Sequence, residues 1–192
     1  NAVWVGTDDE GVVLYERNLT PTSFDEALSL RIPSAYPHDI SLVPVASGGS
    51  HLFWIDAVYN QPEGDTRLWT ARLNENGEMP RAHIRLSDIR AETYDAISDD
   101  NGGALVVWTG GARGEPALYL QRIDPVGRPD FPERLTTDAR FPTLVRANEA
   151  TTVYWLRASD QLVMRGQLEG DTLTGITSIV DSPRHDPADR MV

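Results

Sequence analysis

Short apolar runs separated by polar turns extend along the whole chain. The runs are four to eight residues long and rich in Val, Leu, Ile, Thr, Trp and Tyr, with clusters of Gly, Asn, Asp and Pro between them. Such runs predict β-strands joined by tight turns, because Asn and Gly accept the positive φ angles that these turns require. No window has a convincing helical period, although residues 23–30 (SFDEALSL) begin with a helix-capping serine. The pattern predicts an all-β protein.

Four of the runs carry a tryptophan near the middle, and they recur at similar spacings. The tryptophans are Trp4, Trp54, Trp108 and Trp155, separated by 50, 54 and 47 residues. Each is followed by a second run with a large residue and, four positions later, an aliphatic one. These pairs are Tyr15 and Leu19, Trp69 and Leu73, Tyr119 and Ile123, and Met164 and Leu168. We interpret the pattern as four copies of one unit, with the tryptophans as core residues between neighbouring copies.

Each unit is predicted to be a four-stranded antiparallel meander of about 48 residues. In the third copy the four runs are YDAIS, ALVVWT, ALYLQRID and PERLTT. Four-stranded units at this period are typical of a β-propeller, and a β-sandwich or an irregular barrel is the alternative. The chain is predicted to be one domain, 1–192, with repeats at approximately 1–35, 36–90, 91–138 and 139–182. Residues 183–192 would begin or close a further blade.

The third copy resembles a family of bacterial extracytoplasmic propeller repeats. Its segments DDNGGALVVWTG and LYLQRIDPVG combine a Gly-Gly turn, a strand ending in Trp, and Tyr-x-Gln-Arg-x-Asp-x-x-Gly. The second copy matches in part, through Trp69, Arg72, Leu73 and Gly77, and the first and fourth match poorly. The resemblance implies a propeller in a periplasmic, secreted or cell-surface protein, and it implies no activity.

The ends of the chain are predicted to be complementary halves of one blade. The first copy starts directly at its tryptophan run, and the last residues, SPRHDPADRMV, resemble the lead into the innermost run of other copies, as in SAYPHDISLVPV. Either these ends close a four-bladed ring, or the chain is a piece of a ring of about six to eight blades. The start at Asn1 favours a longer parent, so that missing blades or a second copy would complete the ring.

Charge and composition exclude several classes of function. A net charge of −12 and a pI near 4.6 disfavour nucleic-acid binding, which needs basic residues gathered on one face. All 17 basic residues are arginines and there is no cysteine, which excludes Schiff-base lysines, thiolate nucleophiles and sulfur metal sites. No apolar run approaches the roughly 20 residues that span a bilayer, so direct membrane insertion is not expected.

Motifs for catalysis and metal binding are not found. The four histidines never lie two to five residues apart, and the acidic clusters at 8–10 and 99–101 fit hairpin turns better than the spaced acidic loop that binds calcium. No nucleophile elbow, zinc-protease motif, dinucleotide fingerprint or phosphate loop is present. We therefore predict no metal, no cofactor and no catalytic residue, although two converging carboxylates could still make a glycosidase.

A ligand is expected at the loops on one face of the ring, because loops vary while blades stay rigid. That face would gather aromatic and polar side chains from the loops between blades and from insertions within them. The candidate binding residues are Tyr36, Tyr59, Asp65, Tyr94, Arg113 and Phe141. The alternative is that these aromatic rings fill the space between blades.

The favoured function is a non-enzymatic scaffold or protein-interaction module of an extracytoplasmic bacterial protein. The alternative is a propeller that binds or processes carbohydrate, which the same aromatic and polar residues would suit. Convergence of two or three carboxylates in the central funnel would distinguish the two.

Overall fold

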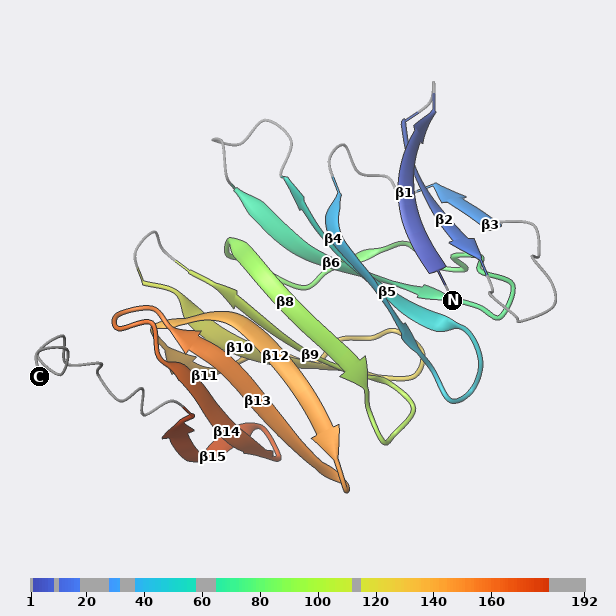
Figure 1. Cartoon of the computed structure of the whole chain (residues 1–192). Helices are drawn as coiled ribbons and strands as arrows, with labels where there is room; N and C mark the ends of the chain where they lie inside the picture. The colour runs from blue at the N-terminus through green and yellow to red at the C-terminus, as the bar shows by residue number, and fades with distance from the viewer. Residues whose placement is uncertain are drawn as a thin grey trace, which may run out of the picture.

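The computed structural model describes residues 2–8, 11–17, 28–31, 37–57, 65–111 and 115–179, and all of its elements are strands. They form four antiparallel sheets that follow one another in chain order (Figure 1). The first sheet has three strands, β1 (Ala2–Asp8), β2 (Gly11–Arg17) and β3 (Leu28–Arg31). The second has β4 (His38–Pro44), β5 (Ser50–Ala57), β6 (Thr66–Leu73) and β7 (Ile84–Arg85). The third has β8 (Ala91–Ser98), β9 (Ala104–Gly110), β10 (Ala117–Ile123) and β11 (Glu133–Thr137). The fourth has β12 (Ala139–Ala147), β13 (Ala150–Arg157), β14 (Val163–Glu169) and β15 (Thr172–Ser178).

The strand register confirms that the chain repeats one unit. Each sheet is a simple meander, and in every sheet the repeat tryptophan lies directly opposite the large residue of the following run. The four pairs are Trp4 with Tyr15, Trp54 with Trp69, Trp108 with Tyr119, and Trp155 with Met164. Among the described residues, the first sheet contains no strand equivalent to the one that precedes the tryptophan strand in the other three sheets.

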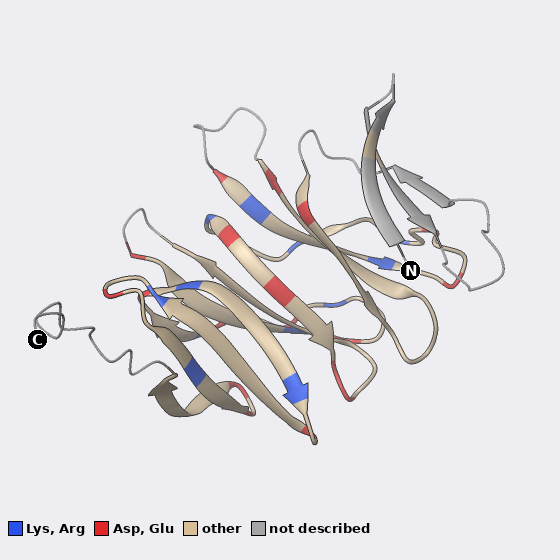
Figure 2. Cartoon of the chain, in the orientation of Figure 1, with Lys and Arg blue, Asp and Glu red and all other residues tan. Residues whose placement is uncertain are grey.

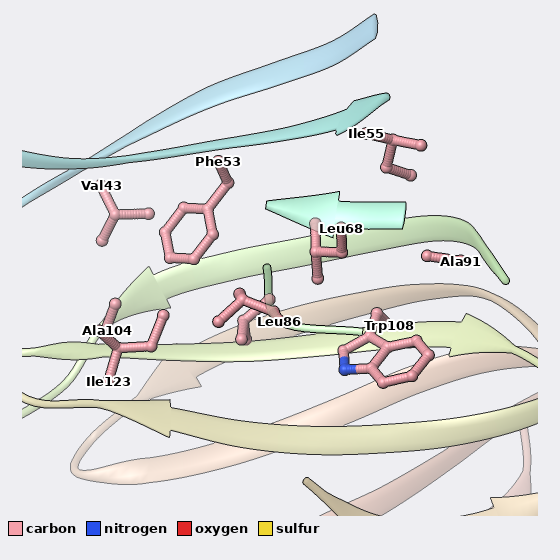
Figure 3. Close-up of a cluster of buried hydrophobic side chains, with 10 residues drawn as sticks. Val43, Phe53, Ile55, Leu68, Leu86, Ala91, Ala104, Trp108 and Ile123 are labelled. Atoms are coloured by element: carbon pink, nitrogen blue, oxygen red, sulfur yellow. The ribbon is translucent and has the colours of Figure 1, made fainter. Parts of the chain in front are cut away.

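Large apolar side chains fill the spaces between neighbouring sheets. Figure 3 shows Phe53, Ile55 and Leu68 of the second sheet facing Trp108 of the third. The next space repeats this arrangement, with Val107 and Leu118 of the third sheet packed against the fourth. Trp54, Trp108 and Trp155 are only 1%, 1% and 3% exposed, so these three are core residues, as predicted.

The turn residues of the repeat have steric roles. The first glycine of each Gly-Gly turn has a positive φ, +93° at Gly48 and +80° at Gly102. Residues that carry a side chain rarely adopt this conformation. The second glycine lies against the neighbouring strand, where a Cβ at Gly103 would overlap the carbonyl oxygen of Ile123. A Cβ at Gly49 would overlap the Leu73 carbonyl in the same way.

The motif arginine links each sheet to the next one. Arg72 donates to the carbonyl oxygens of Ser50 at 3.2 Å and Pro125 at 3.1 Å, and Pro125 belongs to the β10–β11 turn of the following sheet. Arg122 occupies the same register position in the third sheet and donates to the Gly170 carbonyl in the β14–β15 turn, at 2.8 Å. The repeat signature is therefore largely explained by packing and turn formation.

Some strand limits differ from the sequence prediction. The run at 81–87 gives only the two-residue strand β7, because the amide groups of Leu86 and Ser87 both donate to the Leu68 carbonyl and turn the chain inward. Closure of the sheets into a ring is not shown, and the residues at 183–192 lie outside the described ranges. No helix in the described part of the chain has the length and apolar character needed to cross a bilayer.

Candidate functional site

The three described innermost strands, β4, β8 and β12, begin at the same end of the array. In an antiparallel meander that end also holds the connections from each sheet to the next and the loops between second and third strands. Two hollows open at this end. One lies where the innermost strands meet, and the other lies beside the β9–β10 loop.

The cleft at the innermost strands has a volume of about 370 Å³ and draws its walls equally from three sheets. It is lined by Asp39, Ile40 and Ser41 of β4, Thr93, Tyr94 and Asp95 of β8, and Phe141, Pro142 and Thr143 of β12. Segments about 50 residues apart thus supply equivalent positions to one surface, which we call the inner cleft. Tyr94 and Phe141, two of the predicted binding residues, both lie there.

A β-bulge turns Phe141 toward solvent. The β12–β13 register shifts between Arg140 and Thr143, and Phe141 has a φ of +50°, which is rare for a bulky residue. The same irregularity begins β4, where Asp39 has a φ of +51°. Bulges re-aim side chains at functional sites. Here the result is a phenylalanine ring that is 60% exposed at the rim of the inner cleft.

The Tyr94 hydroxyl is engaged in holding two sheets together. It lies 3.0 Å from the Ser41 hydroxyl, and it donates to the carbonyl oxygens of Phe53, at 3.0 Å, and Asp39. Burial raises the pKa of this phenol, and the nearby Asp39 and Asp95 carboxylates raise it further. Tyr94 therefore stays protonated at physiological pH, and its ring packs on Phe53 with a centroid distance of 6.1 Å.

Two carboxylates line the inner cleft, and their surroundings differ. Asp95 accepts hydrogen bonds from the amide groups of Ala96 at 2.9 Å and Leu144 at 2.7 Å, so it fastens β8 to β12. Asp39 is largely exposed and lies 3.0 Å from the His38 ring. The sequence of β8 contains Glu92 and Asp95, and acidic positions are visible on this strand in Figure 2. The cleft can offer an aromatic ring, hydroxyl groups and one exposed carboxylate, that of Asp39, to a ligand.

The second hollow, of about 530 Å³, lies in the third sheet near the start of β10. Its walls include Ile89, Glu115, Tyr119, Arg134 and Asp138. It adjoins the loop that contains Arg113, a predicted binding residue outside the described ranges. Tyr119 belongs to the packed pair with Trp108, with ring centroids 4.3 Å apart, so only part of its surface serves this hollow.

Of the remaining predicted residues the structure describes only Asp65, which lines neither hollow. Asp65 precedes β6 and forms an ion pair with Arg67, including a contact of 3.1 Å. Tyr36 and Tyr59, like Arg113, lie outside the described residues. Sequence reasoning missed Asp39, Asp95 and Pro142. No shared strand position marks them, since Asp39 is the second residue of β4, Asp95 the fifth of β8 and Pro142 the fourth of β12.

Within the described ranges, no three His, Asp or Glu side chains gather in a way that could hold a metal ion. Comparison of the chain with models of known protein families and with curated proteins returns no match.

Proposed function

We propose that the chain is a β-propeller, or part of one, that serves as a non-enzymatic scaffold and binds a protein partner at the end where its innermost strands begin. The observation that carries the proposal is the inner cleft. Its half-buried polar groups, the Tyr94 hydroxyl and the Asp95 carboxylate, hold strands together, while Phe141 at its rim is exposed. A rigid wall with an outward aromatic ring suits binding, because exposed aromatic residues commonly anchor protein contacts.

The propeller architecture is supported by the repeated sheets. Identical meanders that stack through the same residues in chain order generate a radial array when each sheet is rotated slightly from the last. In that array β4, β8 and β12 line the central channel, and the inner cleft lies at its mouth. The resemblance of the third repeat to bacterial extracytoplasmic propellers supports a location outside the cytoplasm as part of this proposal.

Carbohydrate binding is the second candidate, and the exposed Phe141 ring beside the Ser41, Thr93 and Thr143 hydroxyl groups favours it. Aromatic rings stack on sugar faces while hydroxyl and carboxylate groups bond to sugar hydroxyls. Glycan hydrolysis is less well supported, since two carboxyl groups must act on the bond and Asp95 already accepts two backbone hydrogen bonds.

The test compares wild type with Phe141→Ser and with the control Phe131→Ser. Phe131 is 91% exposed and lies away from the inner cleft, so both variants should fold normally. Each protein is immobilised, incubated with the cell-envelope fraction of its source organism, and analysed by quantitative mass spectrometry.

We expect a protein retained by wild type and Phe131→Ser to be lost with Phe141→Ser. Equal retention by all three proteins contradicts the proposed surface. Glycan-array binding that Phe141→Ser abolishes would favour the second candidate, and turnover of nitrophenyl glycosides would contradict a non-enzymatic role.

A further inference from the structure

The inner cleft is acidic. Its lining includes the carboxylates of Asp39 and Asp95 and contains no arginine or histidine. The two carboxylates come from different sheets and lie near one phenol, because burial and then these two negative charges raise the pKa of Tyr94. The basic group closest to them is the half-exposed His38 ring, 3.0 Å from Asp39. At neutral pH the cleft therefore presents negative charge to any ligand that enters it.

The nearest arginines in the sequence do not neutralise this charge. Arg90 forms an ion pair with Glu92 at 3.6 Å, at the start of β8. Arg140 precedes Phe141 in the chain but is not among the residues that line the cleft. Within the part of the chain that the structure describes, the cleft thus has no internal cation, and a complementary positive group has to come from a ligand.

An equivalent bulge in two sheets presents a carboxylate and an aromatic ring to this cleft. Ser41 of β4 and Thr143 of β12 are the first residues paired after the bulge, each opposite the residue that precedes the repeat tryptophan. Asp39 and Phe141 each lie two residues earlier, with φ angles of +51° and +50°. The two residues therefore occupy the same repeat position, one in the second sheet and one in the fourth.

Both side chains are accessible to a ligand. The Asp39 side chain is 58% exposed and Phe141 is 60% exposed. A cation above an aromatic ring is attracted to the negative face of the ring, and arginine is the residue most often found there. The planar guanidinium group can also donate to a carboxylate at the same time, since its N–H groups lie in one plane. A cleft of about 370 Å³ has room for one such side chain.

We propose that the inner cleft receives an arginine side chain of the partner protein, whose guanidinium group stacks on the Phe141 ring and donates to the Asp39 carboxylate. The inference rests on the function proposed above, because it specifies the partner group that enters the same cleft. The net charge of −12 supports it, since a strongly acidic protein attracts basic partners over long distances.

Binding of a single arginine side chain tests the inference without the partner protein. The ¹⁵N-labelled protein is titrated at pH 7.5 with Nα-acetyl-arginine amide and, separately, with Nα-acetyl-citrulline amide, in which a neutral urea group replaces the guanidinium group. We expect the arginine compound to shift the backbone amide signals of Thr93, Tyr94 and Thr143 with a dissociation constant of roughly 1 mM, because exposed ion pairs and cation–π contacts are individually weak. The citrulline compound should give no saturable shift.

Two variants test the two contacts. Asp39→Asn removes the charge and fits the positive φ, which asparagine tolerates, and it keeps the backbone carbonyl that accepts from Tyr94. Phe141→Leu removes the ring and keeps an apolar side chain. Each should weaken binding of the arginine compound by at least about fivefold. The control Asp171→Asn removes the same charge from a side chain that is 57% exposed, in the β14–β15 turn outside the cleft, and should bind as wild type does.

Equal responses to the two compounds, or wild-type affinity in either cleft variant, would overturn the arginine site. Equal weakening in Asp171→Asn would also overturn it, since binding would then follow net charge alone. The retention experiment described above separates this failure from failure of the proposed function. We expect Asp39→Asn to lose the same protein as Phe141→Ser. A partner that Phe141→Ser loses and Asp39→Asn keeps would leave the proposed surface intact and contradict the arginine contact.

Discussion

One buried histidine, His51, should make the folded protein less stable in acid. His51 is fully buried, and neither ring nitrogen has a hydrogen-bond partner among the described residues. Burial, together with the positive charge of nearby Arg72, lowers the pKa of His51 to about 4, and the Asp124 carboxylate partly opposes this shift. The equivalent positions hold Leu105 and Thr152, so the repeat does not require an ionisable group here.

The His51→Leu variant should resist acid better than wild type. Between pH 6.5 and about 4 the unfolded chain binds a proton at His51 that the folded chain does not, so the free energy of unfolding falls as the pH falls through this window. Over this pH window, the free energy of unfolding of the wild type falls by about 3 kcal/mol through His51. Urea unfolding of both proteins at pH 7.5 and pH 4 measures it.

Stability of His51→Leu should fall less than that of wild type over this range, while the same substitution at exposed His38 should leave the fall unchanged. Parallel pH profiles for wild type and His51→Leu would show that His51 is not buried in its neutral form.

Gly103→Ala should destabilise the third sheet by about 2 kcal/mol, since the added methyl group meets the backbone of Ile123, which cannot move alone. Gly166→Ala is the matched control. It also lies in a sheet without a positive φ, but its nearest neighbours are the Ile176 and Leu173 side chains at 3.3 Å, which can shift. Thermal or urea unfolding that gave equal losses would contradict a steric role for the second turn glycine.

At the scale of strands and turns, the sequence predicted most of the fold because the signals are local. Apolar runs define β5, β6, β9 and β10 closely, and β5 and β9 are buried along almost their whole length. The Gly-Gly and Asp-x-x-Gly turns have backbone or side-chain features that explain them. In the latter, the Asp124 carboxylate accepts from the amide groups of Val126 and Arg128, and Asn74 does the same in the second sheet.

The inner cleft was less predictable, because it depends on three strands that are distant in sequence. The sequence does not indicate the bulge that exposes Phe141, because the residue with the positive φ is a phenylalanine rather than a glycine. Tyr94 was expected in a loop on the binding face. The structure places it within β8, where its hydroxyl reaches β4 and β5, a contact that no local pattern encodes.

Arg72→Met should weaken the attachment of the second sheet to the third by about 2 kcal/mol, since it leaves backbone carbonyl groups without their charged donor while keeping most of the side-chain bulk. Arg128→Met, at an exposed position in the β10–β11 turn, should change the free energy of unfolding by less than about 0.5 kcal/mol. Equal urea midpoints for the two variants would contradict the linking role of Arg72.

At the scale of the whole molecule, the structure consists of repeated sheets, of which the second packs on the third and the third on the fourth. Such arrays derive stability from the units and from the contacts between them, so an end sheet with an open surface is the least protected. This explains why the residues that recur between copies, Trp, Gly-Gly and Arg, all contribute to turns or to packing between sheets. Residues that differ between copies, such as Phe141 and Asp39, are the ones available for binding.

We interpret the chain as one unit that is repeated and stacked in a constant register. Hydrogen–deuterium exchange measured for each strand is the test of this interpretation. We expect slow exchange in β5, β9 and β13, each hydrogen-bonded on both sides and covered by a neighbouring sheet on at least one face, with protection recurring at intervals of about 50 residues. Protection that fell on other strands, or that showed no such period, would contradict it.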